Sequence, residues 1–135
     1  MKTSENQNVI FPKGEKAPAD YFTGTAWLRP LVPNDPLLNC QIVNVVFEPG
    51  ARTTWHTHSG GQVLIVTDGL GYYQEQGKPI QLLHKGDVVN IAPGVKHWHG
   101  ASPENALTHI AVNPQTQKGA VDWLEEVTEE EYNSK

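Results

Sequence analysis

The sequence has few of the features that mark secreted, membrane-spanning or disulfide-stabilised proteins. It contains a single cysteine, Cys40, among its 135 residues, which excludes an internal disulfide and is compatible with a reducing compartment. No run of 18 apolar residues occurs, and residues 1–16 lack the apolar stretch of a signal peptide. We therefore expect a soluble, cytoplasmic protein with no membrane partner.

An excess of positive charge is also missing. The net charge of the chain is -5, and residues 122–135 alone account for it, with six acidic side chains against one lysine. Residues 1–121 hold nine acidic and nine basic side chains and show no basic stripe. Because neutralisation of phosphates supplies most of the affinity for nucleic acids, we expect no nucleic-acid partner.

Glycine and proline, by contrast, are plentiful, with 12 and 10 residues, and they separate many short apolar segments. This composition favours short strands joined by tight turns over a helical bundle, and the length suits one domain. The segments whose residues predict strands are 21–28, 41–47, 63–67, 71–76, 80–83, 88–91, 97–98 and 107–112. A proline-rich connection is expected over 30–36, and a turn at Asp68 and Gly69.

Apolar residues recur at helical spacing only near the C-terminus. There, Thr128 and Glu131 have the spacing of a capping box that would begin a last helical turn. We therefore divide the chain into an N-terminal arm at 1–19, a barrel at 20–121 and an acidic C-terminal helix or tail at 122–135.

Five of the six histidines lie on two short strand-like runs and on the strand candidate that follows them, and His56 and His58 form a tight pair separated by one threonine. In an extended strand, side chains two residues apart point the same way about 7 Å apart, so both imidazoles can reach one metal ion. Gln62 follows four positions after His58, and His97 and His99 lie on a second candidate strand. Imidazole is the commonest metal-ligand side chain, and nitrogens from two strands suit a catalytic site better than a closed structural one. The sequence therefore predicts a metalloprotein.

Glycines frame both histidine segments. The first segment, over 50–69, reads GARTTWHTHSGGQVLIVTDG, and the second, over 86–101, reads GDVVNIAPGVKHWHGA. Together they resemble the two sequence motifs of the cupin family, whose members are small double-sheeted barrels that hold a metal in the barrel mouth. The resemblance implies an all-β protein, a single double-stranded β-helix (jelly-roll) cupin barrel with a short C-terminal helix.

The family's metal ligands carry over onto His56, His58 and His97, and Gln62 stands where most cupins have a glutamate. The resemblance thus implies one divalent metal ion per chain. A neutral glutamine leaves the charge of that ion uncompensated, so we expect the ion to act as a Lewis acid more than as a redox centre. We expect Mn²⁺, while Fe²⁺ and Zn²⁺ stay open.

One group of cupins is especially similar. The strings FEPGART, WHTH, LIVT, GDVV, KHWHGA and AVDW resemble those of small bacterial cupins that include manganese-dependent hydroxynitrile lyases, which cleave or form cyanohydrins. This resemblance implies a substrate pocket beside the ligands that contains Val43, Val45, Thr53 and Asn113. It also implies His109 and His99 as catalytic residues, with His109 taking the hydroxyl proton of the substrate.

Simpler roles stay open for some of these residues. Strand alternation would turn Thr53 away from the face of His56 unless a bulge intervenes. His99 is also compatible with a position at the pocket rim, and His109 with a structural one. His84 lies in a turn and is expected to be solvated.

The fold does not settle the reaction. Cupin barrels also support dioxygenases, isomerases and non-catalytic binding of small molecules, so these stay open beside a lyase acting on small carbonyl or cyanohydrin-like molecules. Oxygen uptake would separate a dioxygenase from a Lewis-acid lyase. Since cupins commonly dimerise by exchanging edge strands, the resemblance also implies a homodimer or a homotetramer.

Overall fold

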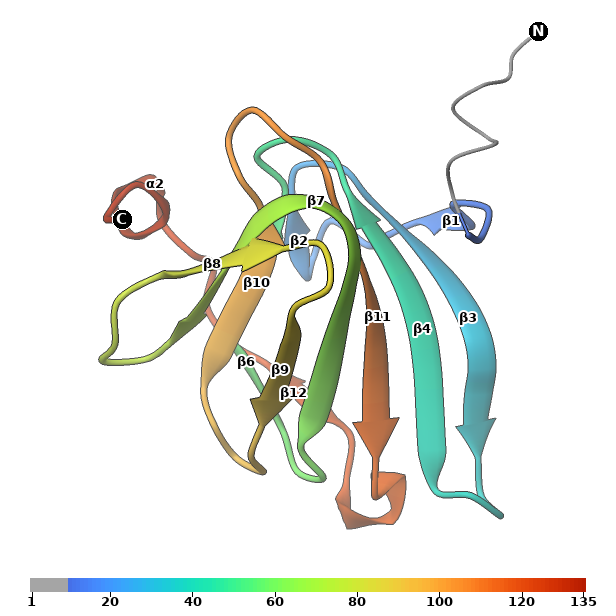
Figure 1. Ribbon diagram of the computed structural model, residues 1–135. Coiled ribbons are helices and arrows are strands. Elements are labelled where there is room, and N and C mark those ends of the chain that lie inside the picture. The colour runs from blue at the N-terminus through green and yellow to red at the C-terminus, as the bar shows by residue number, and fades with distance from the viewer. Residues whose placement is uncertain (1–9) are drawn as a thin grey trace, which may run out of the picture.

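The computed structural model describes residues 10–135, which form two antiparallel sheets curled around a common interior (Figure 1). Residues 1–9 of the predicted N-terminal arm lie outside the described residues. The described strands are β1 (Glu15–Lys16), β2 (Phe22–Thr23), β3 (Ala26–Asp35), β4 (Cys40–Phe47), β5 (Arg52–Thr53), β6 (His56–His58), β7 (Gln62–Glu75), β8 (Gln81–His84), β9 (Val88–Ile91), β10 (His97–Ala101), β11 (Leu107–Pro114) and β12 (Val121–Trp123). The predicted all-β jelly-roll barrel is confirmed.

The two sheets share the long strand β7. In one sheet the order is β1-β3-β4-β11-β7-β9, and β7 contributes residues up to Gly69. In the other sheet the remainder of β7 pairs with β8 and β10, and β10 pairs in turn with β5 and β6. β7 therefore arches over the top of the barrel in Figure 1 and joins its two walls.

The predicted turn at Asp68 and Gly69 is wrong, because β7 continues through it as one strand of 14 residues. The register with β11 shifts between Thr108 and His109, which leaves Thr67 as the extra residue of a β-bulge. Gly69 has a φ of 89°, and a Cβ there would clash with the backbone carbonyl oxygen of Ala106, the residue that precedes β11. A glycine that resembles a hairpin signal thus lets β7 bend from one sheet into the other.

The predicted proline-rich connection at 30–36 is also largely strand. β3 includes Pro30 and Pro33 and pairs with β4, with irregular register around the prolines. On its other side β3 meets β1 only opposite Trp27 and Leu28. Because the rest of β3 is an edge among the described residues, residues that donate no backbone hydrogen bond are tolerated there.

Apolar side chains fill two separate clusters. The larger lies between the sheets and includes Phe47, Leu64 and Leu107, which are fully buried. The smaller cluster consists of Trp55, Trp98, Val127 and Tyr132. Trp98 alternates along β10 with His97 and His99, so this second cluster covers the opposite face of the strand that carries those histidines.

The C-terminal segment closes the smaller cluster. Residues 122–123 of the predicted tail belong to β12, which pairs with β6. The helix α2 (Glu129–Tyr132) has Thr128 as its N-cap, and Oγ1 of Thr128 accepts a hydrogen bond from the Glu131 N–H at 3.1 Å. The reciprocal bond from the Thr128 N–H to the Glu131 carboxylate confirms the predicted capping box. Within residues 10–135, no helix has the length and apolarity needed to cross a bilayer.

Candidate active site and metal centre

Strands β6 and β10 bring four histidines together inside the barrel. His56 and His97 are partners across the two strands, and their ring centroids lie 4.3 Å apart. His58 and His99 each lie two residues further along the same strand, with ring centroids 5.2 Å from His56 and 5.7 Å from His97 respectively. The period of two along a strand and the pairing across strands therefore gather these rings on one face.

Backbone carbonyls orient two of these rings. Nδ1 of His56 lies 2.9 Å from the carbonyl oxygen of Thr54, and Nδ1 of His97 lies 2.9 Å from that of Val95. A carbonyl oxygen only accepts, so each Nδ1 carries the proton and donates it. Each Nε2 is left with a free lone pair, which is the form in which imidazole binds a metal.

Three buried histidines, His56, His97 and His99, offer ring nitrogens that all lie within 4.8 Å of one another and could hold a metal ion. His58 is not in this set, although its Nε2 is buried without a hydrogen-bond partner among the described residues. The set therefore shares two histidines with the predicted ligands. The predicted third ligand, His58, competes with His99 for the remaining position.

Gln62 adds an oxygen to the cluster. It is the first residue of β7 and is almost fully buried. Its Oε1 lies 3.2 Å from Nε2 of His97, while its Nε2 donates a hydrogen bond to Oδ1 of Asn113 at 2.8 Å. Two lone pairs, one on nitrogen and one on oxygen, thus face each other, an arrangement that a cation between them would stabilise. The donor set fits a divalent metal.

Burial keeps the histidines of the cluster neutral. It lowers the pKa of His97 and of His58 to about 4, and His97 adds to the effect on His58. Burial first, and then the neighbouring histidines, lower the pKa of His56 and His99 well below the usual 6.5. At neutral pH these rings are therefore free bases that can bind a metal without first losing a proton.

His109 forms a pair with His99 behind the cluster. Nε2 of His109 lies 2.9 Å from Nδ1 of His99, and burial lowers the pKa of His109 to about 4. The outer nitrogens of the pair, Nε2 of His99 and Nδ1 of His109, have no hydrogen-bond partner among the described residues. Only one proton can occupy the bond between two neutral rings, so the pair can accept a proton at one end and shift the shared proton.

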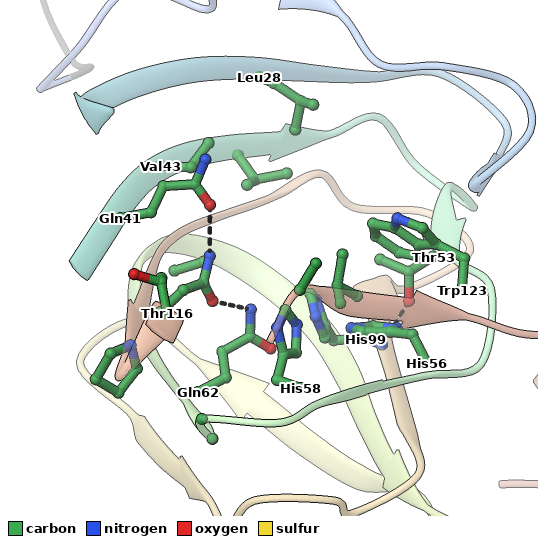
Figure 2. A pocket seen from close by; sticks show the side chains of 18 of the residues that line it. Leu28, Gln41, Val43, Thr53, His56, His58, Gln62, His99, Thr116 and Trp123 are labelled. Atoms are coloured by element: carbon green, nitrogen blue, oxygen red, sulfur yellow. Dashed lines mark hydrogen bonds between the residues drawn. The ribbon is translucent and has the colours of Figure 1, made fainter. Parts of the chain in front are cut away.

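A cavity of about 500 Å³ adjoins this cluster (Figure 2). The predicted pocket residues Val43, Val45, Thr53 and Asn113 line it, and so do the ligand candidates His56, His58 and Gln62 and the pair His99 and His109. His97 lies beside these residues but does not line the cavity. Among the described residues, no aspartate, glutamate, lysine or arginine contributes to the lining.

Thr53 reaches the cavity because strand alternation is interrupted, not because of the bulge considered from the sequence. β5 ends at Thr53 and β6 begins at His56, and the two residues between them belong to neither strand. The break lets Thr53 and His56 face the same interior. Thr53 Oγ1 also accepts a hydrogen bond from the backbone N–H of His99 at 3.3 Å.

Sequence reasoning missed many residues of the cavity wall, among them Gln41 and Trp123. Gln41 could have been found, because it lies two and four residues before Val43 and Val45 and therefore shares their face of β4. The ring centroid of Trp123 lies 4.8 Å from that of His56. Trp123 was missed because residues 122–135 were predicted to form a helix or tail outside the barrel. The exposed position of His84 is as predicted.

The chain is similar to known proteins in both sequence and fold. A family model described as Cupin domain matches residues 43–112. The (R)-mandelonitrile lyase of Granulicella tundricola is 52% identical over 118 residues, which cover 87% of this chain and 89% of that protein.

Solved structures agree with this family. A cupin-like protein from Thermotoga maritima matches with a TM-score of 0.92 and 54% identity, covering 93% of this chain and 96% of that chain. A cupin 2 conserved barrel domain protein from Rhodopseudomonas palustris matches with a TM-score of 0.64 and 21% identity, covering 74% of this chain and 67% of that chain. The second likeness concerns the fold alone.

Replacing His56 or His97 by alanine should remove the bound metal, because each supplies a free Nε2 to the same point. Metal analysis of purified protein should find about one divalent ion per chain in the parent and almost none in either variant. His84→Ala, at an exposed position, is the control and should keep the ion. Comparing His58→Ala with His99→Ala identifies the third histidine. Parental metal content in His56→Ala would contradict the assignment.

Acid should destabilise the metal-free protein. Below pH 6.5 the histidines of the unfolded chain take up protons, whereas His58 and His97, with pKa values of about 4, stay neutral in the folded state. The free energy of unfolding should therefore be constant above pH 6.5 and fall between pH 6.5 and 4, by up to about 1.4 kcal/mol per pH unit for each histidine. Urea unfolding at several pH values measures this slope, which should decrease in His58→Gln. An equal free energy of unfolding at pH 7 and pH 5 would contradict the burial of these histidines in their neutral form.

Proposed function

The chain belongs to the cupin family, and we propose that within it this protein is a metal-dependent lyase that cleaves or forms cyanohydrins of small aldehydes. One observation carries the proposal. Neutral metal donors, a cavity without charged side chains among the described residues, and a buried pair of imidazoles meet in one site. The 52% identity to a protein named (R)-mandelonitrile lyase supports the same reaction.

The metal we propose is Mn²⁺, held by His56, His97, Gln62 and a third histidine. When bound there, a divalent ion would act as a Lewis acid towards a substrate oxygen or nitrile nitrogen. The role of this chain's ligands is to supply donors without charge, so that they leave the positive charge of the ion uncompensated. Imidazole nitrogens and a carboxamide oxygen suit manganese, iron(II) and zinc alike, so the choice among them rests on metal availability as much as on the site.

The cavity favours an uncharged substrate with an apolar group. Leu28 and Val43 lie across the cavity from His58 and Gln62 in Figure 2, so an aldehyde side chain would pack on the apolar wall while its oxygen faces the donors. A volume of about 500 Å³ is within the usual range for small-molecule sites. A second charged group on the substrate would find no counter-ion among the described lining residues and would be costly to bury.

The imidazole pair would handle the proton. In the cleavage direction, the hydroxyl proton of the cyanohydrin passes to the pair formed by His99 and His109 as the C–C bond breaks and its electron pair leaves with cyanide. The aldehyde carbonyl forms, and the imidazolium returns the proton to cyanide as hydrogen cyanide, which balances the reaction. The low pKa of His109 keeps this ring unprotonated at working pH, which is the form that a general base requires.

The direct test is an assay of mandelonitrile cleavage with metal-free and Mn²⁺-loaded protein, with dissolved oxygen recorded throughout. We expect benzaldehyde to form only with the loaded protein and no oxygen to be consumed. Oxygen uptake that matched product formation would indicate a dioxygenase instead. Metal binding without turnover of any cyanohydrin or carbonyl substrate would indicate that the protein binds small molecules without catalysing a reaction.

Replacing His109 should separate proton transfer from metal binding. His109→Ala should lower kcat/KM by about 10²- to 10⁴-fold, because a general base is lost, and should keep the parental metal content, because His109 lies outside the group that could hold an ion. His99→Ala is less informative since His99 belongs to that group. His84→Ala serves as the control for activity. Turnover of His109→Ala at the parental rate would make His109 a structural residue.

A further inference from the structure

Three side-chain amides form a hydrogen-bonded chain that ends at the histidine cluster. Nδ2 of Asn113 donates to Oε1 of Gln41 at 3.1 Å, and Nε2 of Gln62 donates to Oδ1 of Asn113 at 2.8 Å. The two dashed lines between Gln41 and Gln62 in Figure 2 are these bonds. The remaining atom of Gln62, Oε1, faces Nε2 of His97 at 3.2 Å.

Sheet register builds this chain. Gln41 and Asn113 are partners across β4 and β11, and Asn113 lies one residue beyond Val112, which pairs with Val63 of β7. The three amides therefore lie in a row across three neighbouring strands, on the face that lines the cavity. Because a shift of one residue would turn each side chain to the other face, the row depends on the same register that places His109 on β11.

The bonds of the chain are coupled in direction. A carboxamide has one donating and one accepting end, so turning Asn113 would bring its NH₂ group against the NH₂ group of Gln62. Gln62 would then have to turn as well and would present its NH₂ group to His97. An amide nitrogen has no lone pair to offer a metal, and in that orientation it would also occupy Nε2 of His97 by hydrogen bonding.

We infer that Asn113 and Gln41 are positioning residues that hold the carboxamide oxygen of Gln62, and not its NH₂ group, towards the metal centre. Asn113 acts directly on Gln62, and Gln41 acts through Asn113. The inference rests on the metal site of the proposed function and deepens it, because it explains how a neutral side chain with two different ends is kept as an oxygen ligand. Partners that orient a metal ligand typically contribute 10- to 100-fold to metal affinity.

The dissociation constant for Mn²⁺, measured on metal-free protein by competition with a chelator, tests this role without reference to turnover. Asn113→Leu removes both hydrogen bonds and should raise the dissociation constant about 10- to 100-fold. Asn113→Asp still accepts from Gln62 and should bind Mn²⁺ at least as tightly as the parent. Gln41→Leu should show a smaller loss. Asn34 lines the same cavity but does not belong to the hydrogen-bonded row of amides. Asn34→Leu should therefore leave the dissociation constant for Mn²⁺ unchanged.

A double-mutant cycle separates positioning from a general effect on the pocket. If Asn113 acts through Gln62, Asn113→Leu should cause little further loss of Mn²⁺ affinity in a Gln62→Ala background. An equal loss in both backgrounds, or parental affinity in Asn113→Leu, would overturn the inference. If Asn113→Leu does not fold by circular dichroism, the pair Gln41→Leu and Asn113→Asp gives the same test.

The failure of this inference can be distinguished from the failure of the proposed lyase activity. A parent protein that binds no divalent metal would overturn both the positioning role and the metal-dependent mechanism, and the parent measurement alone would show it. A parent that binds Mn²⁺ but cleaves no cyanohydrin would contradict the proposed activity and leave the amide chain to be judged by its own variants.

Discussion

Two backbone carbonyls, those of Thr54 and Val95, control the chemistry of the site. Each accepts the Nδ1 proton of the histidine two residues later, His56 or His97, and so fixes both the orientation of the ring and the nitrogen that stays free. The pairing of the two histidines across β6 and β10 then directs both free nitrogens to one point. In the proposed site, the oxygen of Gln62 and the pair of His99 and His109 can contribute only because the free nitrogens of His56 and His97 converge.

Burial keeps the histidines neutral and able to bind a metal, but it also makes their unpaired lone pairs energetically unfavourable. Unpaired lone pairs inside a barrel are unfavourable, and the low pKa values of the histidines show that protons cannot relieve the cost near neutral pH. A shared cation can. The adjoining cavity is lined by apolar side chains, amides and neutral histidines among the described residues. In the proposed function, it would let a small polar group of an otherwise uncharged molecule reach the cation. In the proposed function, the burial that makes a bound cation favourable would therefore also restrict the substrates.

Much of this arrangement follows from local patterns in the sequence. Strand alternation places His56 and His58 on one face, and the resemblance of the two glycine-framed segments to the cupin motifs predicts the barrel and brings Gln62 and His97 to the same place. The failures come from effects that act between strands. The bend at Gly69 depends on the neighbouring strand β11, and the prolines of β3 are tolerated because that strand lies at an edge. Thr53 reaches the cavity through a break between two strands that alternation alone does not reveal.

Sequence spacing cannot decide whether His58 or His99 is the third histidine of the candidate metal site. His58 and His99 are each two residues from a histidine that faces the cluster, so the period of the strand treats them alike. Only the relative placement of β6 and β10 distinguishes them, and in the structure it brings His99 into the tight group together with His56 and His97. The hydrogen-bonded row of amides could not be predicted from the sequence either, because Gln41, Gln62 and Asn113 meet only through the register of three strands.

A crystal structure of the Mn²⁺-loaded protein, with anomalous data collected at the manganese edge, would test the convergence of these donors most directly. We predict one anomalous peak per chain, at roughly 2.0–2.4 Å from Nε2 of His56, Nε2 of His97 and Oε1 of Gln62, with Nε2 of Gln62 still bonded to Asn113. An ion bound elsewhere, or a Gln62 whose oxygen turns away from the ion, would contradict the metal centre described above.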